Sequence, residues 1–392
     1  MAIRKLTQNI LSVGVQDWDR RSFDEFMALP DGTSYNSFIV RGNDKTVLID
    51  TSDPDKYAEF FQNLQDAGLT HLDYIVSNHG EQDHSGLIPD VLQRFPDAMV
   101  VTNAKCKGIL IDHLNIPADK FIVVNDNDTI DLGGKTLQFM LAPWVHWPDT
   151  MFTYVVEEKV LFTCDFLGSH LATTSAFVDD PARTIMDARR YFAEIMMPFR
   201  RMIPKYIARI RELAPDIIAP SHGPAHNDPD LILNAYEQWV SGEPKRIVLI
   251  PYISMHNSTK IMVDYLVDRL TDMGVDCLPM NLKKCDIGQF AVNLVEAAAV
   301  IFATPTFLVG PHPFVLEAAV VMGLLKPKTR VVGFMGSYGW GSKAMKILQD
   351  QLKMVKATFL EPVKIKGLPT DDTLKALDDM SRQILEAIGD GE

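Results

Sequence analysis

Short apolar runs separated by turn residues dominate the first part of the chain. Asn36–Val40 and Thr46–Asp50 flank the turn Gly42-Asn43-Asp44, a pattern that predicts two strands joined by a turn. A helix-like stretch over Asp55–Ala67 ends at Gly68. We predict further strands at 72–77, 99–102, 121–124, 136–141, 151–156, 160–163 and 217–219, and helices at 183–197 and 204–213. This part therefore predicts a domain rich in closely spaced strands.

The pattern changes after the turn residues Ser241-Gly242-Glu243-Pro244. From there on, strands alternate strictly with helix-length segments. The predicted strands are 247–250, 275–278, 299–303, 331–334 and 361–365. Such alternation predicts a parallel sheet with helices on both faces. Because 392 residues exceed what a single hydrophobic core usually holds, we predict two domains, 1–244 and 245–392.

Composition and charge exclude several classes of protein. Apolar residues make up 47% and charged residues 23%, as in ordinary globular proteins. The net charge of −13, from 51 acidic and 38 basic residues, argues against nucleic acid or an anionic membrane as the main partner. No apolar run approaches the ~20 residues of a membrane span, and the N-terminus is not a signal peptide. The four cysteines form no CxxC pair and suit a reducing cytoplasm.

A cluster of potential metal ligands directly follows the predicted strand at 72–77. The segment His79-Gly80-Glu81-Gln82-Asp83-His84 holds two imidazoles and two carboxylates within six positions. A lone His or Asp on a loop is commonly a polar surface residue, but four potential ligands on one short loop are hard to explain in that way. Imidazole and carboxylate together suit first-row transition metals. The segment therefore predicts a metal site, which we expect to hold two metals.

This segment resembles the HxHxDH signature of the metallo-β-lactamase superfamily, with Glu81 in place of the second histidine. HxExDH is the variant found in flavodiiron proteins. Three further motifs are similar to that family and follow in the same order: His146-Trp147-Pro148-Asp149, Asp165 within the segment 162–168, and Ser221-His222-Gly223. The resemblance extends over the whole chain.

The resemblance implies an α/β chain in which an N-terminal metallo-β-lactamase-like αββα sandwich precedes a flavodoxin-like doubly wound parallel sheet. It also implies two irons with separate ligand sets. One set is His79, Glu81 and His146, the other is Asp83, His84 and His222, and Asp165 bridges both metals. Two ferrous ions, three carboxylates and one hydroxide sum to zero charge, which a pocket of low dielectric favours.

Two histidines leave alternatives open. In some members of the family the histidine that corresponds to His84 is turned away from the metal. In those proteins it lies near the metal without binding it. His226 follows His222 by four residues and is an alternative ligand or a hydrogen-bond partner. The match of Ser221-His222-Gly223 to the family's turn favours His222.

A hydroxyl-rich loop follows the first strand of the second domain. Ser254, Ser258 and Thr259 lie where a helix is expected to begin, and a helix N-terminus attracts phosphate. The loop lacks the GxxxxGK pattern of an NTPase, and the chain contains no GxGxxG. Taken alone, such a loop is better explained as an N-cap.

The loop nevertheless resembles the phosphate loop of flavodoxins, and two later segments are similar to the flavodoxin segments that hold the isoalloxazine ring. The resemblance implies FMN bound by three groups of residues: Ser254, Met255, His256, Asn257, Ser258 and Thr259; Thr304, Pro305, Thr306, Phe307 and Gly310; and Ser337, Tyr338, Gly339, Trp340 and Gly341. Relatives commonly carry His or Asn where Phe307-Leu308-Val309 stand, so we expect altered hydrogen bonding near the flavin.

These features predict a flavodiiron oxidoreductase that reduces O2 to water, NO to N2O, or both. Two irons and an FMN hydroquinone together supply the four electrons that dioxygen requires. The family implies a head-to-tail homodimer or a dimer of dimers, and an external donor such as rubredoxin or a reduced deazaflavin. The alternatives are a zinc hydrolase fused to a flavodoxin module, and a non-catalytic flavin electron carrier.

Overall fold

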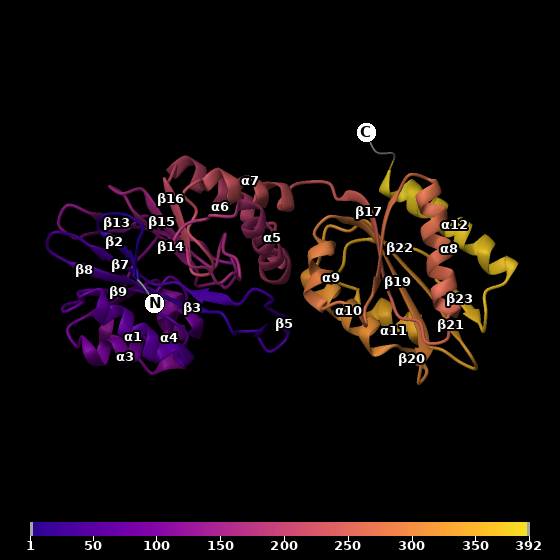
Figure 1. The fold of residues 1–392 in the computed structure, drawn as a ribbon, viewed down its shortest axis with the longest axis horizontal. Helices are drawn as coiled ribbons and strands as arrows, with labels where there is room; N and C mark the ends of the chain where they lie inside the picture. The colour runs from indigo at the N-terminus through magenta and orange to yellow at the C-terminus, as the bar shows by residue number, and fades with distance from the viewer. Residues whose placement is uncertain (1–2, 390–392) are drawn as a thin grey trace. The chain divides into compact units, whose positions relative to one another are not determined.

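The computed structural model describes residues 3–389, which fall into two compact units. The first unit contains the residues up to Phe192 and Phe199–Val240, and the second contains Ala193–Pro198 and the residues from Ser241 onward. Figure 1 shows both units. The division after Val240 lies near the predicted domain boundary between residues 244 and 245. The exact position of that boundary stays a prediction. No helix in residues 3–389 is long and apolar enough to cross a membrane.

The first unit is built on two β-sheets. One has the order β1 (Arg4–Lys5), β2 (Ile10–Ser12), β7 (Phe38–Arg41), β8 (Thr46–Ile49), β9 (Tyr74–Val76), β10 (Met99–Thr102) and β11 (Phe121–Val123). The other has the order β12 (Thr129–Asp131), β13 (Thr136–Leu141), β14 (Met151–Val155), β15 (Val160–Cys164) and β16 (Ile217–Pro220). Two small hairpin-like pairs complete the strands: β3 (Val15–Asp17) with β6 (Thr33–Tyr35), and β4 (Ser22–Phe23) with β5 (Met27–Ala28).

Alternation along the strands of the first sheet separates two hydrophobic cores. Ile39 and Ile75 belong to a core that includes residues of the helices on one face, whereas Val40 and Val76 belong to the core shared with the second sheet. The helices on the first face are α1 (Tyr57–Asp66), α3 (Ile88–Arg94) and α4 (Ala104–Leu114). The short helices in this part are η1 (Pro54–Lys56), α2 (Gln82–Ser85) and η2 (Ala118–Lys120).

A fourth layer of helices covers the outer face of the second sheet (Figure 1). Phe152 of β14 contacts Tyr206 of this layer, with ring centroids 6.1 Å apart. The layer consists of α5 (Pro181–Tyr191), α6 (Ile203–Leu213) and α7 (Pro229–Val240). The first unit is therefore the predicted αββα sandwich.

The second unit has a parallel sheet of order β18 (Asp276–Asn281), β17 (Lys245–Tyr252), β19 (Ala297–Phe307), β21 (Val331–Tyr338) and β22 (Thr358–Phe359). β23 (Val363–Lys366) also pairs with β21, and β20 (Gly310–Pro311) folds back on β19. α8 (Ser258–Asp272) and α12 (Asp371–Ile388) cover one face, and α9 (Ile287–Leu294), α10 (Pro313–Leu325) and α11 (Ala344–Gln351) the other (Figure 1). This strand order and two-sided cover confirm the flavodoxin-like prediction.

Two local predictions are corrected by the structure. The helix expected over 183–197 ends at Tyr191 and continues as a π-helical turn over Phe192–Met196 and a 3-10 turn over Met197–Phe199. The last strand begins at Val363, two residues later than predicted, because residues before it loop out between β22 and β23. Helices α3 and α4 were not predicted.

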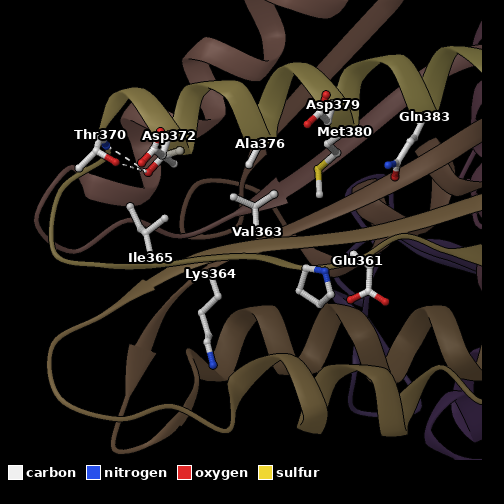
Figure 2. Close-up of a pocket in the computed structure, with 12 residues that line it drawn as sticks. Glu361, Val363, Lys364, Ile365, Thr370, Asp372, Ala376, Asp379, Met380 and Gln383 are labelled. Atoms are coloured by element: carbon white, nitrogen blue, oxygen red, sulfur yellow. Dashed lines mark hydrogen bonds between the residues drawn. The ribbon is translucent and has the colours of Figure 1, made fainter.

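A cavity of about 440 Å³ opens between β23 and α12 in the second unit (Figure 2). Val363 and Ile365 point toward α12, whereas Lys364 points to the other side of the strand (Figure 2). None of the predicted metal or flavin residues lines this cavity.

Candidate metal centre and flavin site

The predicted metal-binding segment follows the carboxyl end of β9, an inner strand of the first sheet. Buried hydrogen bonds hold the turn: Ser77 Oγ donates to the His79 carbonyl oxygen at 2.9 Å, and the Asn78 amide donates to Asp50 Oδ1 at 2.7 Å. Asp83 and His84 then fall on the short helix α2. The loop and helix together aim all four ligand-type side chains at one place.

One group of ligand atoms comes from three separate segments of the chain. His79, Glu81, His146 and Asp165 each contribute one atom, and these atoms all lie within 4.8 Å of one another. Glu81 Oε2 is 3.2 Å from His79 Nε2 and 3.4 Å from His146 Nε2. Such a set of two imidazoles and two carboxylates fits one divalent metal.

A second group lies beside the first. Ligand atoms of Asp83, His84 and His222 also lie within 4.8 Å of one another. Asp83 Oδ1 is 3.2 Å from His84 Nε2, and Asp83 Oδ2 is 3.2 Å from His222 Nε2. The structure thus brings His84 into the site, the orientation that the sequence left open.

Asp165 lies between the two groups, with one carboxylate oxygen facing each. Its Oδ2 is 3.7 Å from His79 Nε2 and 3.5 Å from His146 Nε2. Its Oδ1 is 3.0 Å from His84 Nε2 and 3.4 Å from His222 Nε2. This is the arrangement that a carboxylate bridging two metals requires.

Several of these polar atoms have no hydrogen bond although they are buried. Both carboxylate oxygens of Asp83, and the Nε2 atoms of His84 and His222, make none within the described residues. A buried polar atom left without a hydrogen bond costs about 1–3 kcal/mol. These atoms lie about 3 Å apart but do not have the geometry of hydrogen bonds to one another. A metal ion bound between them would satisfy all of them.

The electrostatics of the pocket favour positive charge. Burial lowers the pKa of His222, but the nearby carboxylates of Asp165 and Asp83 outweigh it and raise that pKa to about 10. Burial likewise opposes the shift at His146, where Asp165 and Glu81 raise the pKa to about 9. The carboxylates therefore stabilise a cation at the imidazole nitrogens, whether that cation is a proton or a metal.

The turn that presents His222 depends on its glycine. Gly223 has a φ of +81°, and an added Cβ would lie 2.1 Å from Ser169 Oγ. His222 Nδ1 lies 2.5 Å from the Ser34 carbonyl oxygen, which can accept its proton and leave Nε2 facing Asp83 and Asp165. The motif Ser221-His222-Gly223 is thus explained by backbone geometry as well as by metal chemistry.

The other candidate histidines lie outside both ligand groups. His226 is buried, with Nε2 3.2 Å from the Leu167 carbonyl oxygen, and burial lowers its pKa to about 4. His170 lies beside the site, with its ring 4.9 Å from that of His222 and its Nδ1 2.9 Å from Thr33 Oγ1. We therefore assign neither of them to a metal.

Two neighbours of the centre were not predicted as site residues. The buried Tyr191 hydroxyl donates to Asp165 Oδ1 at 2.9 Å, and Asp149 Oδ2 lies 3.0 Å from His79 Nδ1. Asp149 belongs to the recognised motif 146–149, so its proximity to a ligand was a usable signal. Tyr191 had no such signal, because it approaches from α5 and only the tertiary fold places it there.

The predicted flavin segments meet at the carboxyl ends of β17, β19 and β21. They line a cavity of about 190 Å³. Nine predicted residues lie on it: Met255, His256, Ser258, Thr259, Pro305, Thr306, Ser337, Tyr338 and Gly339. Gly367 also lines it and was not predicted; it follows β23 and donates its amide to the Tyr338 carbonyl oxygen at 3.0 Å.

The remaining predicted flavin residues do not line this cavity. Ser254 Oγ accepts from the Lys260 amide at 3.2 Å, and Asn257 is the N-cap of α8 in a left-handed conformation. Thr304 is buried and its hydroxyl accepts from the His312 amide at 2.9 Å. Of the others, Phe307 is the last residue of β19 and Gly310 lies in β20. Trp340 and Gly341 lie in the loop that follows β21, with Trp340 81% exposed.

An orphaned hydroxyl marks the phosphate end of the cavity. Thr259 lies in the first turn of α8 and is 1% exposed, yet its Oγ1 has no hydrogen-bond partner in the described structure. The N-terminus of this 15-residue helix offers free amides and a positive dipole end to the same place. Both features fit a bound phosphate group.

Comparison with known proteins agrees with this geometry. The ODP family of beta-lactamases matches residues 33–223. A nitric oxide reductase of Moorella thermoacetica is 35% identical over 98% of both chains, and a coenzyme F420H2 oxidase of Methanothermobacter marburgensis is 32% identical over 99% of both. The solved structure of rubredoxin oxygen:oxidoreductase from Desulfovibrio gigas superposes with a TM-score of 0.93, at 28% identity over 99% of this chain and 98% of that one.

The fold and the paired ligand groups define a flavodiiron-type oxidoreductase. With relatives above 30% identity over nearly its whole length, the chain belongs to the flavodiiron protein family. The predicted family, fold class and oxidoreductase function, reduction of O2 or NO, are thereby confirmed at the level of the family. The relatives' names favour this function over the zinc hydrolase and the non-catalytic electron carrier.

Proposed function

We propose that this chain reduces dioxygen, nitric oxide or both at a pair of irons, using electrons relayed through FMN. One iron would be held by His79, Glu81 and His146, and the other by Asp83, His84 and His222. The position of Asp165 carries the proposal, because its two oxygens face the two ligand groups separately. Two ligand groups that share one carboxylate would suit a pair of metal ions.

When bound, two ferrous ions supply two electrons and an FMN hydroquinone supplies two more. Reduction of O2 to two waters consumes four electrons and four protons, and reduction of two NO to N2O and water consumes two of each. The side chains of His79, His84 and Asp165 are at most 2% exposed, so they hold the centre away from bulk water.

The side chains of Glu81 and His146 are the more exposed ligands, at 21% and 12%. A small gas would therefore reach the centre from their side. Tyr191 fixes the bridging carboxylate from the opposite, buried side by donating to Asp165 Oδ1.

FMN would lie in the cavity at the carboxyl ends of β17, β19 and β21, with its phosphate at Thr259 and the N-terminus of α8. Electron transfer between flavin and irons needs the two close together. The family resemblance supports a head-to-tail homodimer, or a dimer of two such dimers, in which the FMN of one chain faces the metals of another. The four free cysteines suit a reducing cytoplasm.

An external donor would deliver electrons to the flavin. The charge of the protein surface beside the flavin cavity indicates which donors would bind there. Lys364 and Lys366 are exposed on β23, next to Gly367, and Lys364 Nζ lies 5.5 Å from the ring of Tyr338 in the flavin cavity. Among residues 3–389, none of those that line that cavity is acidic. An acidic donor, such as a rubredoxin or a reduced deazaflavin with an anionic side chain, would be attracted there.

The test is to purify the protein, measure its iron, zinc and FMN, reduce it anaerobically, and mix it with each gas in turn. We expect about two irons and one FMN per chain, and reoxidation of the flavin by at least one gas. Full cofactor content without reoxidation by either gas would refute the proposal. Zinc without flavin absorbance would favour the hydrolase.

A further inference from the structure

A buried carboxylate lies directly behind His79. Asp149 is 1% exposed, and its Oδ2 lies 3.0 Å from His79 Nδ1 and accepts the Gly80 amide at 2.8 Å. Its own position is fixed by Asn103, whose side-chain amide donates to the Asp149 carbonyl oxygen at 2.5 Å. Asn103 also caps α4, so the backbone of Asp149 is tied to a rigid element.

This contact decides which nitrogen of His79 is available to a metal. A carboxylate can only accept, so Nδ1 carries the proton and donates it to Asp149. The lone pair is then on Nε2, which faces Glu81 and Asp165. Among the described residues, the only ion pair of Asp149 is the one with His79.

The two proposed metal positions have matched ligand sets, each with two histidines, one carboxylate of its own and a share of Asp165. They differ in what lies behind one histidine of each set, His79 and His222. His79 is backed by a charged carboxylate, whereas Nδ1 of His222 meets the neutral carbonyl oxygen of Ser34. A carboxylate partner raises the basicity of a ligating imidazole more than a carbonyl does.

A second difference acts in the same direction. The Tyr191 hydroxyl donates to Asp165 Oδ1, the oxygen that faces His84 and His222, and so withdraws negative charge from that position. Apart from the ligand imidazoles, the described residues give the oxygen facing His79 only the longer hydrogen bond from the Cys164 thiol, at 3.8 Å.

We infer that Asp149 is a positioning residue that makes the two metal positions unequal, so that the metal at His79, Glu81 and His146 is bound more tightly than its neighbour. The inference rests on the proposed di-iron function. It predicts that loss of the charge on Asp149 weakens one metal selectively.

The test compares the native chain with Asp149→Asn and Asp149→Ala. The full-length protein is stripped of iron and titrated with ferrous ion against a competing chelator under anaerobic conditions. Asparagine keeps an acceptor for His79 and Gly80 but removes the charge, whereas alanine removes both. The matched control is Asp187→Asn, which neutralises a largely buried carboxylate of the same unit outside both ligand groups.

We expect two separate binding steps in the native protein and in the control. In D149N the tighter step should weaken about 10–100-fold while the weaker step stays unchanged, and D149A should lose more. The ⁵⁷Fe Mössbauer spectrum of D149N should show one of two iron signals altered. If D149A does not fold, D149N alone decides.

Unchanged affinities in D149N, or equal weakening of both steps, would overturn the inference while leaving the di-iron proposal intact. A native protein that binds fewer than two metals would instead overturn the di-iron proposal, and the inference with it.

Discussion

The two units differ in the chemical character of the residues that form their sites. Residues 1–244 carry 21 basic and 35 acidic residues, a net charge of −14, whereas residues 245–392 carry 17 and 16, a net charge of +1. The metal centre is a buried group of charged and imidazole side chains. The flavin cavity is lined by hydroxyls, glycines and short loops, and no acidic side chain lines it.

The difference follows from what each site has to hold. Metal cations need several negative ligands at close range, and the protein can bury those ligands only because the metals compensate their charge. A phosphate and a flat ring need donors and room for backbone approach, which a helix N-terminus and strand ends supply without buried charge. The two sites should therefore respond to mutation separately.

The largest effect is expected from Asp165→Ala. This change removes the one ligand shared by both groups, and with it the negative charge that offsets the repulsion between two neighbouring cations. Iron should fall from about two per chain to below one, and turnover should fall at least about a hundredfold. FMN content should stay at its native level, as measured by absorbance after release. Two retained irons would contradict the bridging role of Asp165.

The reciprocal change is Thr259→Val, which replaces the orphaned hydroxyl in the first turn of α8 by a methyl group. A hydrogen bond to a charged group contributes about 1.5–3 kcal/mol, so the Kd for FMN should rise about 10–100-fold while iron content stays unchanged. Fluorescence titration of the flavin-free chain measures it. Thr271→Val, at the exposed far end of the same helix, is the control and should bind FMN as the native chain does.

The residues that we assign to the two sites could be proposed from the sequence because most of them lie in contiguous motifs at strand ends. His79–His84 follows β9, and Ser258 and Thr259 follow β17, so local pattern and position in the fold coincide. The αββα sandwich and the doubly wound parallel sheet also followed from the resemblance.

Other features depend on tertiary packing and leave no local pattern. Tyr191 approaches Asp165 from a helix 26 residues later, and the orientation of His84 is decided by its neighbours Asp83 and Asp165. Gly367 reaches the flavin cavity only because β23 pairs with β21 beside Tyr338. Helix α4 escaped prediction although Asn103 accepts from the Lys105 and Cys106 amides as its cap.

The difference in net charge between the two units can be tested at Lys364 and Lys366, where the donor is proposed to bind. Changing Lys364 and Lys366 together to Glu should lower kcat/KM for an acidic protein donor about tenfold at low ionic strength, because electrostatic steering is lost. The difference should shrink as salt is added. Reduction by dithionite of the same FMN-loaded chains serves as a check on the flavin. A double change of the exposed Lys5 and Lys105 to Glu, in the acidic unit, should leave donor kinetics nearly unchanged; an equal loss there would indicate an effect of net charge alone.

The smallest effects concern acidic residues away from both sites, and they should have opposite signs in the two units. Burial, followed by the nearby Asp31, raises the pKa of Asp187 to about 7, against the attraction of Arg183 and Arg190. A carboxyl group whose folded pKa is raised contributes stability below the unfolded pKa near 3.8 and loses it as pH rises through about 7. Asp187→Asn, neutral at every pH, should therefore raise Tm by about 2 °C at pH 8 and have little effect near pH 4.

In the second unit, Asp350 pairs with Lys346 and Lys353 at 2.9 Å, and these partners lower its pKa. Stability from such a lowered pKa is present above the unfolded value and disappears as pH falls through the folded one. Asp350→Asn should lower Tm slightly at pH 8 and leave it unchanged at pH 3, because the pair is exposed and screened by solvent. Calorimetry of both variants at pH 4 and pH 8, with D350N also at pH 3, checks the pair. If both variants shift Tm in the same direction at pH 8, surface repulsion in the whole chain, rather than the local surroundings of each acid, controls their stability.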